Sequence, residues 1–306
     1  MSEKNPEWSG YVFAALTLLI WSGFVVVSRF GSKGVLNPFD IAALRIGTAA
    51  VVLVPWWLPR LLDASRRRLA LHHSISFALL AGIGYPLVAY SGFIFAPASH
   101  GAVLISGMLP FFTSILALIF LGEKPGRGRL VGLVFILTGV ATLLGSSLLT
   151  VGAGGKVIVG DLLLLSASVL WALFTVLLRF WKAKAFDVTL GVAAVSALIY
   201  LPIYLLFLPK HIAAAPLRDI LIQAVFQGVL VVCVAMWTYA RAAELLGTVR
   251  TVIMMSTVPV VGALLAVPIL GESLSSGAAI GAATTFLGAL VGAMAGAKPP
   301  VAINKG

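Results

Sequence analysis

Aromatic side chains with polar tips lie well inside several long apolar stretches of this chain. They are Trp21, Tyr85, Tyr90, Trp171, Trp237 and Tyr239. Such rings can stack on apolar or aromatic groups, while their N–H and O–H groups need hydrogen-bond partners. We therefore expect these six residues to line a pocket for a small molecule. Simple packing of the rings against neighbouring segments is the alternative.

Three polar side chains accompany these rings. Arg45 lies inside an apolar stretch, where a charge is costly. It could hold a carboxylate or gate the outer mouth of the pocket, or its side chain could reach the interface or pair with Asp40 or with backbone carbonyls. His100 could be an outer-gate ligand or a pH-sensitive element, or it could bond to water or backbone. Gln227 could bind the small molecule or bond to a neighbouring helix. The carboxylates lie at the edges of the stretches, which favours uncoupled flux over obligate proton or sodium coupling.

Two prolines interrupt matching apolar stretches, Pro110 in MLPFFTSILALIFLGE and Pro259 in TVPVVGALLAVPILGE. Proline has no backbone N–H, so each frees a carbonyl one turn earlier, at Ser106 or Met255. Broken helices are tolerated at membrane depth where the loosened backbone is buried in protein or lines a cavity. We expect Pro110 and Pro259 to act as hinges and the two freed positions to face the pocket. A packing kink remote from the pocket is the alternative.

The matching stretches are part of a longer internal repeat. Pro110 and Pro259 are 149 residues apart, as are Glu123 and Glu272, while Trp21 and Trp171 are 150 apart. The Phe39-Asp40 pair recurs 147 residues later as Phe186-Asp187. Small changes of offset between apolar segments are expected of a duplicated unit with altered loops. The sequence predicts two copies, in residues 1–150 and 151–306.

The composition places both copies in a membrane. The 306 residues are 60% hydrophobic and 10% charged, and crossing hydrocarbon takes about 20 apolar residues per helix. The segments lack the alternating polarity of β-barrel strands. The sequence predicts an all-α membrane protein of ten spans, at about 9–30, 39–58, 74–95, 99–121, 129–149, 158–180, 187–208, 217–241, 247–270 and 275–296.

The arrangement of charge predicts the topology. Fifteen of the 21 Lys and Arg residues fall on one side of the predicted spans and five on the other, with Arg45 inside a span. This asymmetry places both termini in the cytoplasm. The net charge of +11 therefore reflects topology and attraction to anionic lipid, not a nucleic-acid partner. Because each copy has an odd number of spans, the two are expected to be inverted about a central cavity, an architecture of secondary transporters.

Other classes find little support in the sequence. A single Cys233 excludes an intramolecular disulfide and a cysteine-based metal site. No metal or cofactor is expected, and no nucleophile with its base occurs at one depth, so we predict no enzymatic activity. Glycines spaced mostly by four, beginning with Gly128 and Gly277, are expected to pack the fifth helices of the two copies together. A monomer or weak homodimer is the expected state. Glu123 and Glu272 are expected to bond to helix ends or to neighbours such as Lys124.

The order of these features resembles a known family. W-S-x-F in the first span, Y-x-G-F-x-x-A-P-A-S-H-G-A-V-L entering the fourth, and the L-P…G-E stretch before a glycine-rich span resemble the drug/metabolite transporter superfamily, in its ten-helix exporter branch. Within that branch the chain is most similar to bacterial exporters of aromatic amino acids. The resemblance implies a secondary exporter of amphipathic metabolites in the bacterial inner membrane, with amino acids as substrate. A lipid-linked sugar flippase or a drug or nucleoside exporter of the same superfamily is the alternative.

Overall fold

The computed structural model describes residues 6–63, 69–149 and 155–295. These residues form ten helical segments that are long and apolar enough to cross a membrane, which confirms the predicted all-α architecture. Six of the spans are single helices: α1 (Pro6–Lys33), α2 (Pro38–Leu62), α7 (Arg127–Leu149), α8 (Lys156–Phe180), α9 (Ala185–Phe207) and α14 (Ser276–Ala295).

The other four spans are built from consecutive pieces. Span three is α3 (Leu71–Phe77), η2 (Ala78–Gly84) and α4 (Tyr85–Phe95), and span eight is α10 (Leu217–Gln223), η6 (Ala224–Val234) and α11 (Ala235–Leu246). Span four is α5 (Ala98–Gly101), η3 (Ala102–Gly107) and α6 (Leu109–Leu121), and span nine is α12 (Thr248–Met255) and α13 (Val258–Leu270). The short η5 (Ile212–Ala214) lies between spans seven and eight. The interrupted spans thus occupy equivalent places in the two predicted copies.

The two prolines break spans four and nine as predicted. Helix α6 begins at Leu109 and α13 begins at Val258, so Pro110 and Pro259 each lie in a first turn, where a missing N–H costs no intrahelical bond. Both helices then end at glycines with positive φ, Gly122 at 68° and Gly271 at 66°. A left-handed residue at this place terminates a helix, and only glycine adopts it without steric cost.

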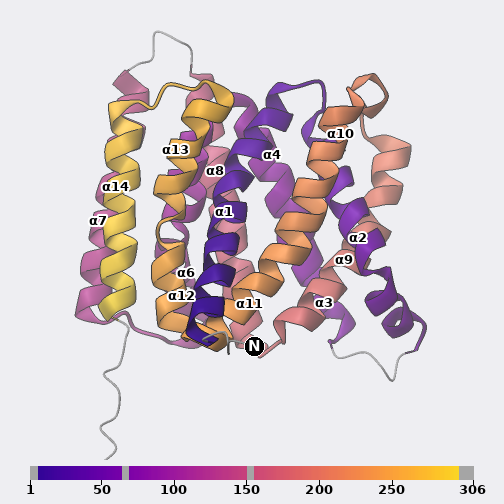
Figure 1. Ribbon diagram of the computed structural model, residues 1–306, viewed down its shortest axis with the longest axis horizontal. Coiled ribbons are helices and arrows are strands. Elements are labelled where there is room, and N and C mark those ends of the chain that lie inside the picture. Colours follow the sequence, from indigo (N-terminus) through magenta and orange to yellow (C-terminus); the bar gives the residue numbers. More distant parts are fainter. Residues whose placement is uncertain (1–5, 64–68, 150–154, 296–306) are drawn as a thin grey trace, which may run out of the picture.

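The helices pack in pairs that match when the two predicted copies are exchanged (Figure 1). Helix α1 packs against α11 and α13, and its counterpart α8 packs against α4 and α6. Helix α2 packs against its counterpart α9, and α7 packs against its counterpart α14. The first residue of α1 and the last of α14 lie at the same end of the bundle, which is lower in Figure 1. This arrangement is consistent with inverted repeats.

Glycines bring α7 and α14 into backbone contact, as the glycine spacing predicts. A Cβ atom at Gly132 would lie 2.4 Å from the carbonyl oxygen of Gly288, and one at Gly288 would lie 2.5 Å from that of Gly132. Gly139 and Gly281 have the same reciprocal relation, at 2.8 and 2.9 Å. Backbone atoms cannot move aside as side chains can, so these four positions require glycine for the two helices to approach this closely.

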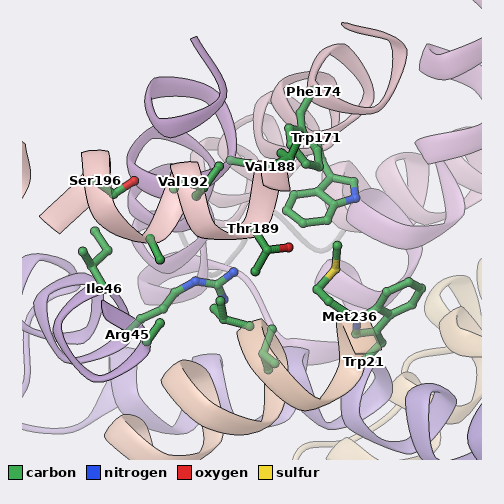
Figure 2. Close-up of a pocket in the computed structure, with 16 residues that line it drawn as sticks. Trp21, Arg45, Ile46, Trp171, Phe174, Val188, Thr189, Val192, Ser196 and Met236 are labelled. Carbon is green, nitrogen blue, oxygen red and sulfur yellow. The ribbon is translucent and has the colours of Figure 1, made fainter. Parts of the chain in front are cut away.

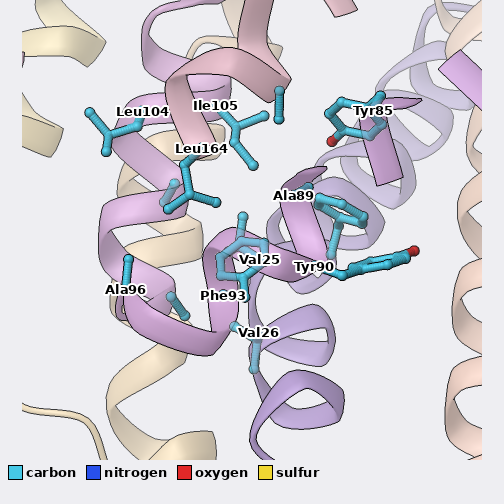
Figure 3. Packing of buried hydrophobic residues seen from close by; sticks show 14 of the residues in the cluster. Val25, Val26, Tyr85, Ala89, Tyr90, Phe93, Ala96, Leu104, Ile105 and Leu164 are labelled. Carbon is cyan, nitrogen blue, oxygen red and sulfur yellow. The ribbon is translucent and has the colours of Figure 1, made fainter. Parts of the chain in front are cut away.

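The largest hydrophobic core lies where α1, α4, η3 and α8 meet. Figure 3 shows Val25 and Val26 of α1 beside Tyr90 and Phe93 of α4, with Leu164 of α8 packed against them. Tyr90, Phe93 and Leu164 are fully buried. This core occupies the half of the bundle that contains the last turns of α1, so that half is tightly packed.

Candidate functional site

A partly open pocket lies between the two predicted copies (Figure 2). It has about 640 Å³ of space, part of which is open to the surroundings, and it is bounded by α1, α2 and η2 on one side and α8, α9, η6 and α11 on the other. The lining residues are Trp21, Arg45, Ile46, Ala49, Ala81, Gly82, Trp171, Phe174, Val188, Thr189, Val192, Ala193, Ser196, Val231, Val232 and Met236.

Residues at equivalent positions of the two predicted copies line this pocket together. Trp21 and Trp171, 150 residues apart, both contribute an indole. At the 147-residue offset of spans two and seven, the lining pairs are Arg45 with Val192, Ile46 with Ala193, and Ala49 with Ser196. The pocket therefore lies where equivalent surfaces of the two copies face each other, but only one copy supplies a cation.

The aromatic side of the pocket is formed by the two indoles and the rings behind them. Trp171 lies 4.8 Å from the ring of Tyr85 and 5.1 Å from that of Phe174, measured between centroids. Trp21 lies 5.2 Å from the ring of Tyr239. The tyrosines support the indoles from behind, and Figure 2 shows the Met236 side chain between Trp21 and Trp171. Polarisable rings and a thioether form a surface suited to an apolar or aromatic group.

The polar side of the pocket is formed by Arg45, which Figure 2 shows reaching in from α2. Its Nη1 donates to Oε1 of Gln227 at 3.5 Å, and its guanidinium lies 5.9 Å from the centre of the Phe24 ring. Arg45 is buried, and Asp40 bonds elsewhere, so the predicted alternatives of an interfacial side chain or an Asp40 pair are wrong. Gln227 bonds to neighbouring helices, which was the second of its two predicted roles.

The other predicted pocket residues lie at varying distances from the lining. Tyr90 is fully buried and lies close to Arg45, although its hydroxyl makes no hydrogen bond of good geometry within the described structure. Trp237 projects outward, with 56% of its surface exposed and its ring edge-on to Phe13 at 5.3 Å. Ser106 and Met255 are not among the lining residues, and Met255 packs beside α1 and α11. Ser106 and Met255 were predicted to contact the substrate, but neither residue lines this pocket.

The hinge prolines lie one layer behind the pocket. Helix α6, which carries Pro110, packs against α8, and α13, which carries Pro259, packs against α1. Helices α8 and α1 in turn present Trp171 and Trp21 to the pocket. A change of angle at either proline would thus act on a helix that carries a pocket indole, and the hinge role stays a prediction.

Sequence reasoning missed three polarisable or polar lining residues, Thr189, Ser196 and Met236. Ser196 is buried at the edge of the lining, and its Oγ has no hydrogen-bond partner within the described structure. The internal repeat could have predicted the position of Ser196. Its equivalent in the other copy is Ala49, which lies one turn along α2 from Arg45. Comparing the faces of equivalent spans would have identified it.

One end of the bundle is closed by a buried ion pair between the two copies; we call it the Arg29 end. Arg29 Nε lies 2.8 Å from Glu272 Oε1, and the two side chains are only 8% and 11% exposed. Arg29 also donates to the carbonyls of Phe93 and Ile94, and the Ala98 N–H donates to Glu272 Oε2 at 2.8 Å. These bonds connect spans one, three and four with the segment after span nine.

Two further buried carboxylates reinforce the Arg29 end. Asp40 accepts a 2.6 Å hydrogen bond from the Tyr204 hydroxyl, which joins α2 to α9. His100 Nδ1 lies 2.8 Å from Asp161 Oδ1, which joins α5 to α8. His100 is buried, so the predicted alternative of a loop-end histidine bonded to water or backbone is wrong. Its predicted place at one mouth of the bundle agrees with this contact, while its function as a gate stays a prediction.

The opposite end, which we call the Arg179 end, contains the pair equivalent to Arg29 and Glu272 in a more exposed state. Arg179 pairs with Glu123, but the two side chains are 46% and 43% exposed. Arg60 Nη2 lies 3.5 Å from Asp187 Oδ1, and Arg250 pairs with Glu7 at 3.1 Å. Glu272 bonds to a helix end as expected, through the Ala98 N–H that begins α5. The expectation did not foresee that Glu272 and Glu123 each also pair with an arginine of the other copy.

The pocket extends from the middle of the bundle toward the Arg179 end. At a rise of about 1.5 Å per residue, Val188 lies about 5 Å from the start of α9 at that end. On the opposite side, Arg45 lies about 10 Å from the start of α2 at the Arg29 end. The closed end and the pocket thus lie at different depths of the same bundle.

The model of the EamA-like transporter family matches this chain twice, over residues 8–145 and 158–293. The chain belongs to that family. It is therefore a multi-pass membrane transporter of the drug/metabolite transporter superfamily, and not an enzyme. Each of the two matched stretches lies within one of the predicted copies.

Relatives of this EamA-like chain carry names of the same kind. An uncharacterized transporter of Clostridium kluyveri is 24% identical over 92% of both chains. An uncharacterized transporter of Archaeoglobus fulgidus is 30% identical over 55% of this chain and 56% of its own length. One crystal structure covers 96% of this chain and 99% of its own, with a TM-score of 0.63 and 21% identity, and so supports the fold.

Proposed function

We propose that this EamA-like transporter is a secondary exporter of small amphipathic metabolites, with aromatic and other neutral amino acids as the substrates to test first. The observation that carries the proposal is the pocket lined by equivalent positions of both copies, with two indoles on one side and a guanidinium on the other. The indoles suit an apolar or aromatic side chain, and the guanidinium suits a polar head group. The names of the relatives support transport without specifying a substrate.

The proposed mechanism is alternating access between two inverted copies. The double match of the family model and the paired helix contacts support a duplicated unit. The proposed boundary between residues 150 and 151 lies outside the described residues. If the copies exchange conformations, the contacts now buried at the Arg29 end loosen, while their equivalents at the Arg179 end become buried. The pocket would then open toward the Arg29 end.

The proposed orientation places the Arg179 end in the cytoplasm of a bacterial cell and the Arg29 end outside the inner membrane. It is supported by the excess of Lys and Arg on the side that contains Arg60, Arg179 and Arg250. In this orientation the pocket extends toward the cytoplasm, and the outer end is closed. An exporter would load its substrate in this conformation.

Flux into liposomes tests this function directly. Purified protein is reconstituted, and entry of labelled amino acids, sugars and nucleosides is measured with and without a pH gradient. We expect flux of aromatic amino acids that does not require the gradient. Flux of sugars or nucleosides alone would contradict the substrate class, and charge movement that follows the gradient would contradict uncoupled transport.

The pocket indoles provide a site-specific prediction. We expect Trp21→Ala and Trp171→Ala each to lower the flux at least about tenfold, because each removes a stacking surface worth about 1.5 kcal/mol, close to a factor of ten. Trp56→Ala is the matched control, since Trp56 is also on a spanning helix but half exposed and outside the pocket lining. Wild-type rates in both pocket variants, with folded protein, would remove the indoles from the site.

A further inference from the structure

Two buried arginines of this chain have very different surroundings. Arg29 is 7% exposed and Arg45 is 5% exposed. Arg29 is satisfied by the Glu272 carboxylate and two backbone carbonyls. The neighbours of Arg45 among the described residues are neutral: the amide of Gln227 accepts from it at 3.5 Å, and the Tyr90 hydroxyl lies close by. A guanidinium carries five N–H donors, and burying its charge without an anion is costly, so Arg45 is built to receive one.

The surroundings of Arg45 fix its direction without neutralising it. Gln227 is fully buried, and its Nε2 donates to Ser28 Oγ at 3.1 Å. Arginine has only donors, so the Gln227 amide must face it with its oxygen, and the bond to Ser28 holds that orientation. The ring of Phe24 lies beside the guanidinium, with 5.9 Å between the ring centroid and Arg45 Cζ. Arg45 is thereby held from behind, and Figure 2 shows its guanidinium reaching into the pocket.

The pocket offers no opposite charge to a cationic ligand. Within the described structure, its lining includes one charged residue, Arg45, and no Asp or Glu. The hydroxyls of Thr189 and Ser196 and the indoles of Trp21 and Trp171 are the other side chains with polar groups, and all are neutral. A ligand ammonium would therefore find no carboxylate, only hydroxyls and indole faces, in a space that already contains a fixed positive charge.

From these contacts we propose that the substrates are amphipathic carboxylates, whose carboxylate is held by Arg45 and whose apolar body lies against Trp21 and Trp171. The amino group of an amino acid adds little to recognition, so organic acids that lack it bind at least as well. This inference rests on the proposed transport function and specifies the substrate class of the same pocket. A bidentate carboxylate would also supply the anion that Arg45 lacks among the described residues.

Four probes that differ in one group each test the inference. Binding of 3-phenylpropionate, 3-phenylpropionamide, phenylalanine and 2-phenylethylamine to the full-length protein in nanodiscs is measured by calorimetry. We expect 3-phenylpropionate to bind as tightly as phenylalanine or more tightly. The amide and the amine, which lack the carboxylate, should bind at least about tenfold more weakly.

Variants locate the recognition at Arg45. Arg45→Gln should reduce the difference between 3-phenylpropionate and its amide to less than about twofold, and Arg45→Lys should retain part of it. Arg241→Gln is the matched control: it also removes one positive charge, but from an exposed pair with Glu244 outside the pocket lining. It should leave the difference unchanged. Thermal unfolding checks that each variant is folded. If Arg45→Gln does not fold, binding of the four probes to the wild-type protein still tests the inference.

The outcomes separate this inference from the proposed function. If the amide or the amine binds as tightly as 3-phenylpropionate, the carboxylate assignment is wrong while an aromatic substrate class stands. If phenylalanine binds tightly and 3-phenylpropionate does not, the amino group is recognised and the inference is wrong. If none of the four binds, the aromatic substrate class itself falls, and the inference falls with it.

Discussion

The two ends of this bundle contain equivalent contacts in different states. Arg29 with Glu272 and Arg179 with Glu123 are equivalent pairs, at offsets of 150 and 149 residues, and each joins one copy to the other. The first pair is almost completely buried, and the second is nearly half exposed. The same chemical groups therefore seal one end and leave the other accessible.

The carboxylates that begin spans two and seven differ in the same way. Asp40 at the Arg29 end is fully buried and bonded by Tyr204 at 2.6 Å, whereas Asp187 at the Arg179 end makes a longer 3.5 Å contact with Arg60. A protein whose ends carry equivalent groups has two arrangements of similar energy available. A buried Arg29 end together with a more exposed Arg179 end is the difference expected in one of those two arrangements.

The largest effect should come from breaking the two equivalent ion pairs in turn. Glu272→Gln leaves a buried Arg29 without its anion, at a cost of about 3–5 kcal/mol to the closed Arg29 end. Glu123→Gln removes an exposed pair, which is worth about 0.2–1 kcal/mol. We expect the first variant to open the Arg29 end and the second to have little effect.

Labelling of a single thiol measures this difference. The chain has one cysteine, so Ser99→Cys in a Cys233→Ser background places one reporter at the buried Arg29 end. Glu272→Gln should raise its labelling rate at least about a hundredfold, since 1.4 kcal/mol corresponds to a factor of ten. Equal rates in the Glu272 and Glu123 variants would contradict the difference between the ends.

A smaller effect is expected at the carboxylates that begin spans two and seven. Tyr204→Phe removes a hydrogen bond to the buried Asp40 carboxylate, which should lower the stability by about 1.5–3 kcal/mol. Asp187→Asn at the other end should lower the stability less, because its 3.5 Å contact with Arg60 is longer and Arg60 is 29% exposed. Thermal unfolding in detergent compares the two. A larger loss of stability in Asp187→Asn than in Tyr204→Phe would mean that the contacts at the Arg179 end are the stronger ones.

The smallest effect should come from the pair of Arg250 and Glu7 at the Arg179 end. Their side chains are 55% and 60% exposed, so the Coulomb attraction is screened by water and salt. Arg250→Gln should leave the midpoint of thermal unfolding almost unchanged and leave transport within about twofold of the wild type. A tenfold loss of flux would show that this contact is needed in another conformation.

The sequence predicted the features that depend on the repeat and on glycine or proline. The ten spans, the breaks at Pro110 and Pro259, and the close packing of α7 on α14 all follow from local backbone chemistry and apolar length. Depth along a span could also be predicted, and it placed Trp21 and Trp171 near the pocket.

The face of a helix and the state of each end could not be predicted in this way. Trp237 has the right depth, but its neighbour Thr238 faces inward to Thr17 at 2.7 Å, which turns the Trp237 indole outward. Arg29 and Arg179 are identical in type and equivalent in position, so local sequence gives no reason for one to be buried. That difference is a property of one conformation of the whole bundle.

Access to the pocket from each side of the membrane tests the account most directly. Thr189→Cys, in the Cys233→Ser background, places a thiol in the pocket near the Arg179 end. Membrane-impermeant reagent is applied to right-side-out and inside-out vesicles. Alternating access with the Arg29 end closed predicts fast labelling from the cytoplasmic face and slow labelling from outside, with the outside rate raised by Glu272→Gln. Fast labelling from outside alone would contradict this mechanism. Equal rates from both faces in the protein with Glu272 unchanged would contradict it as well.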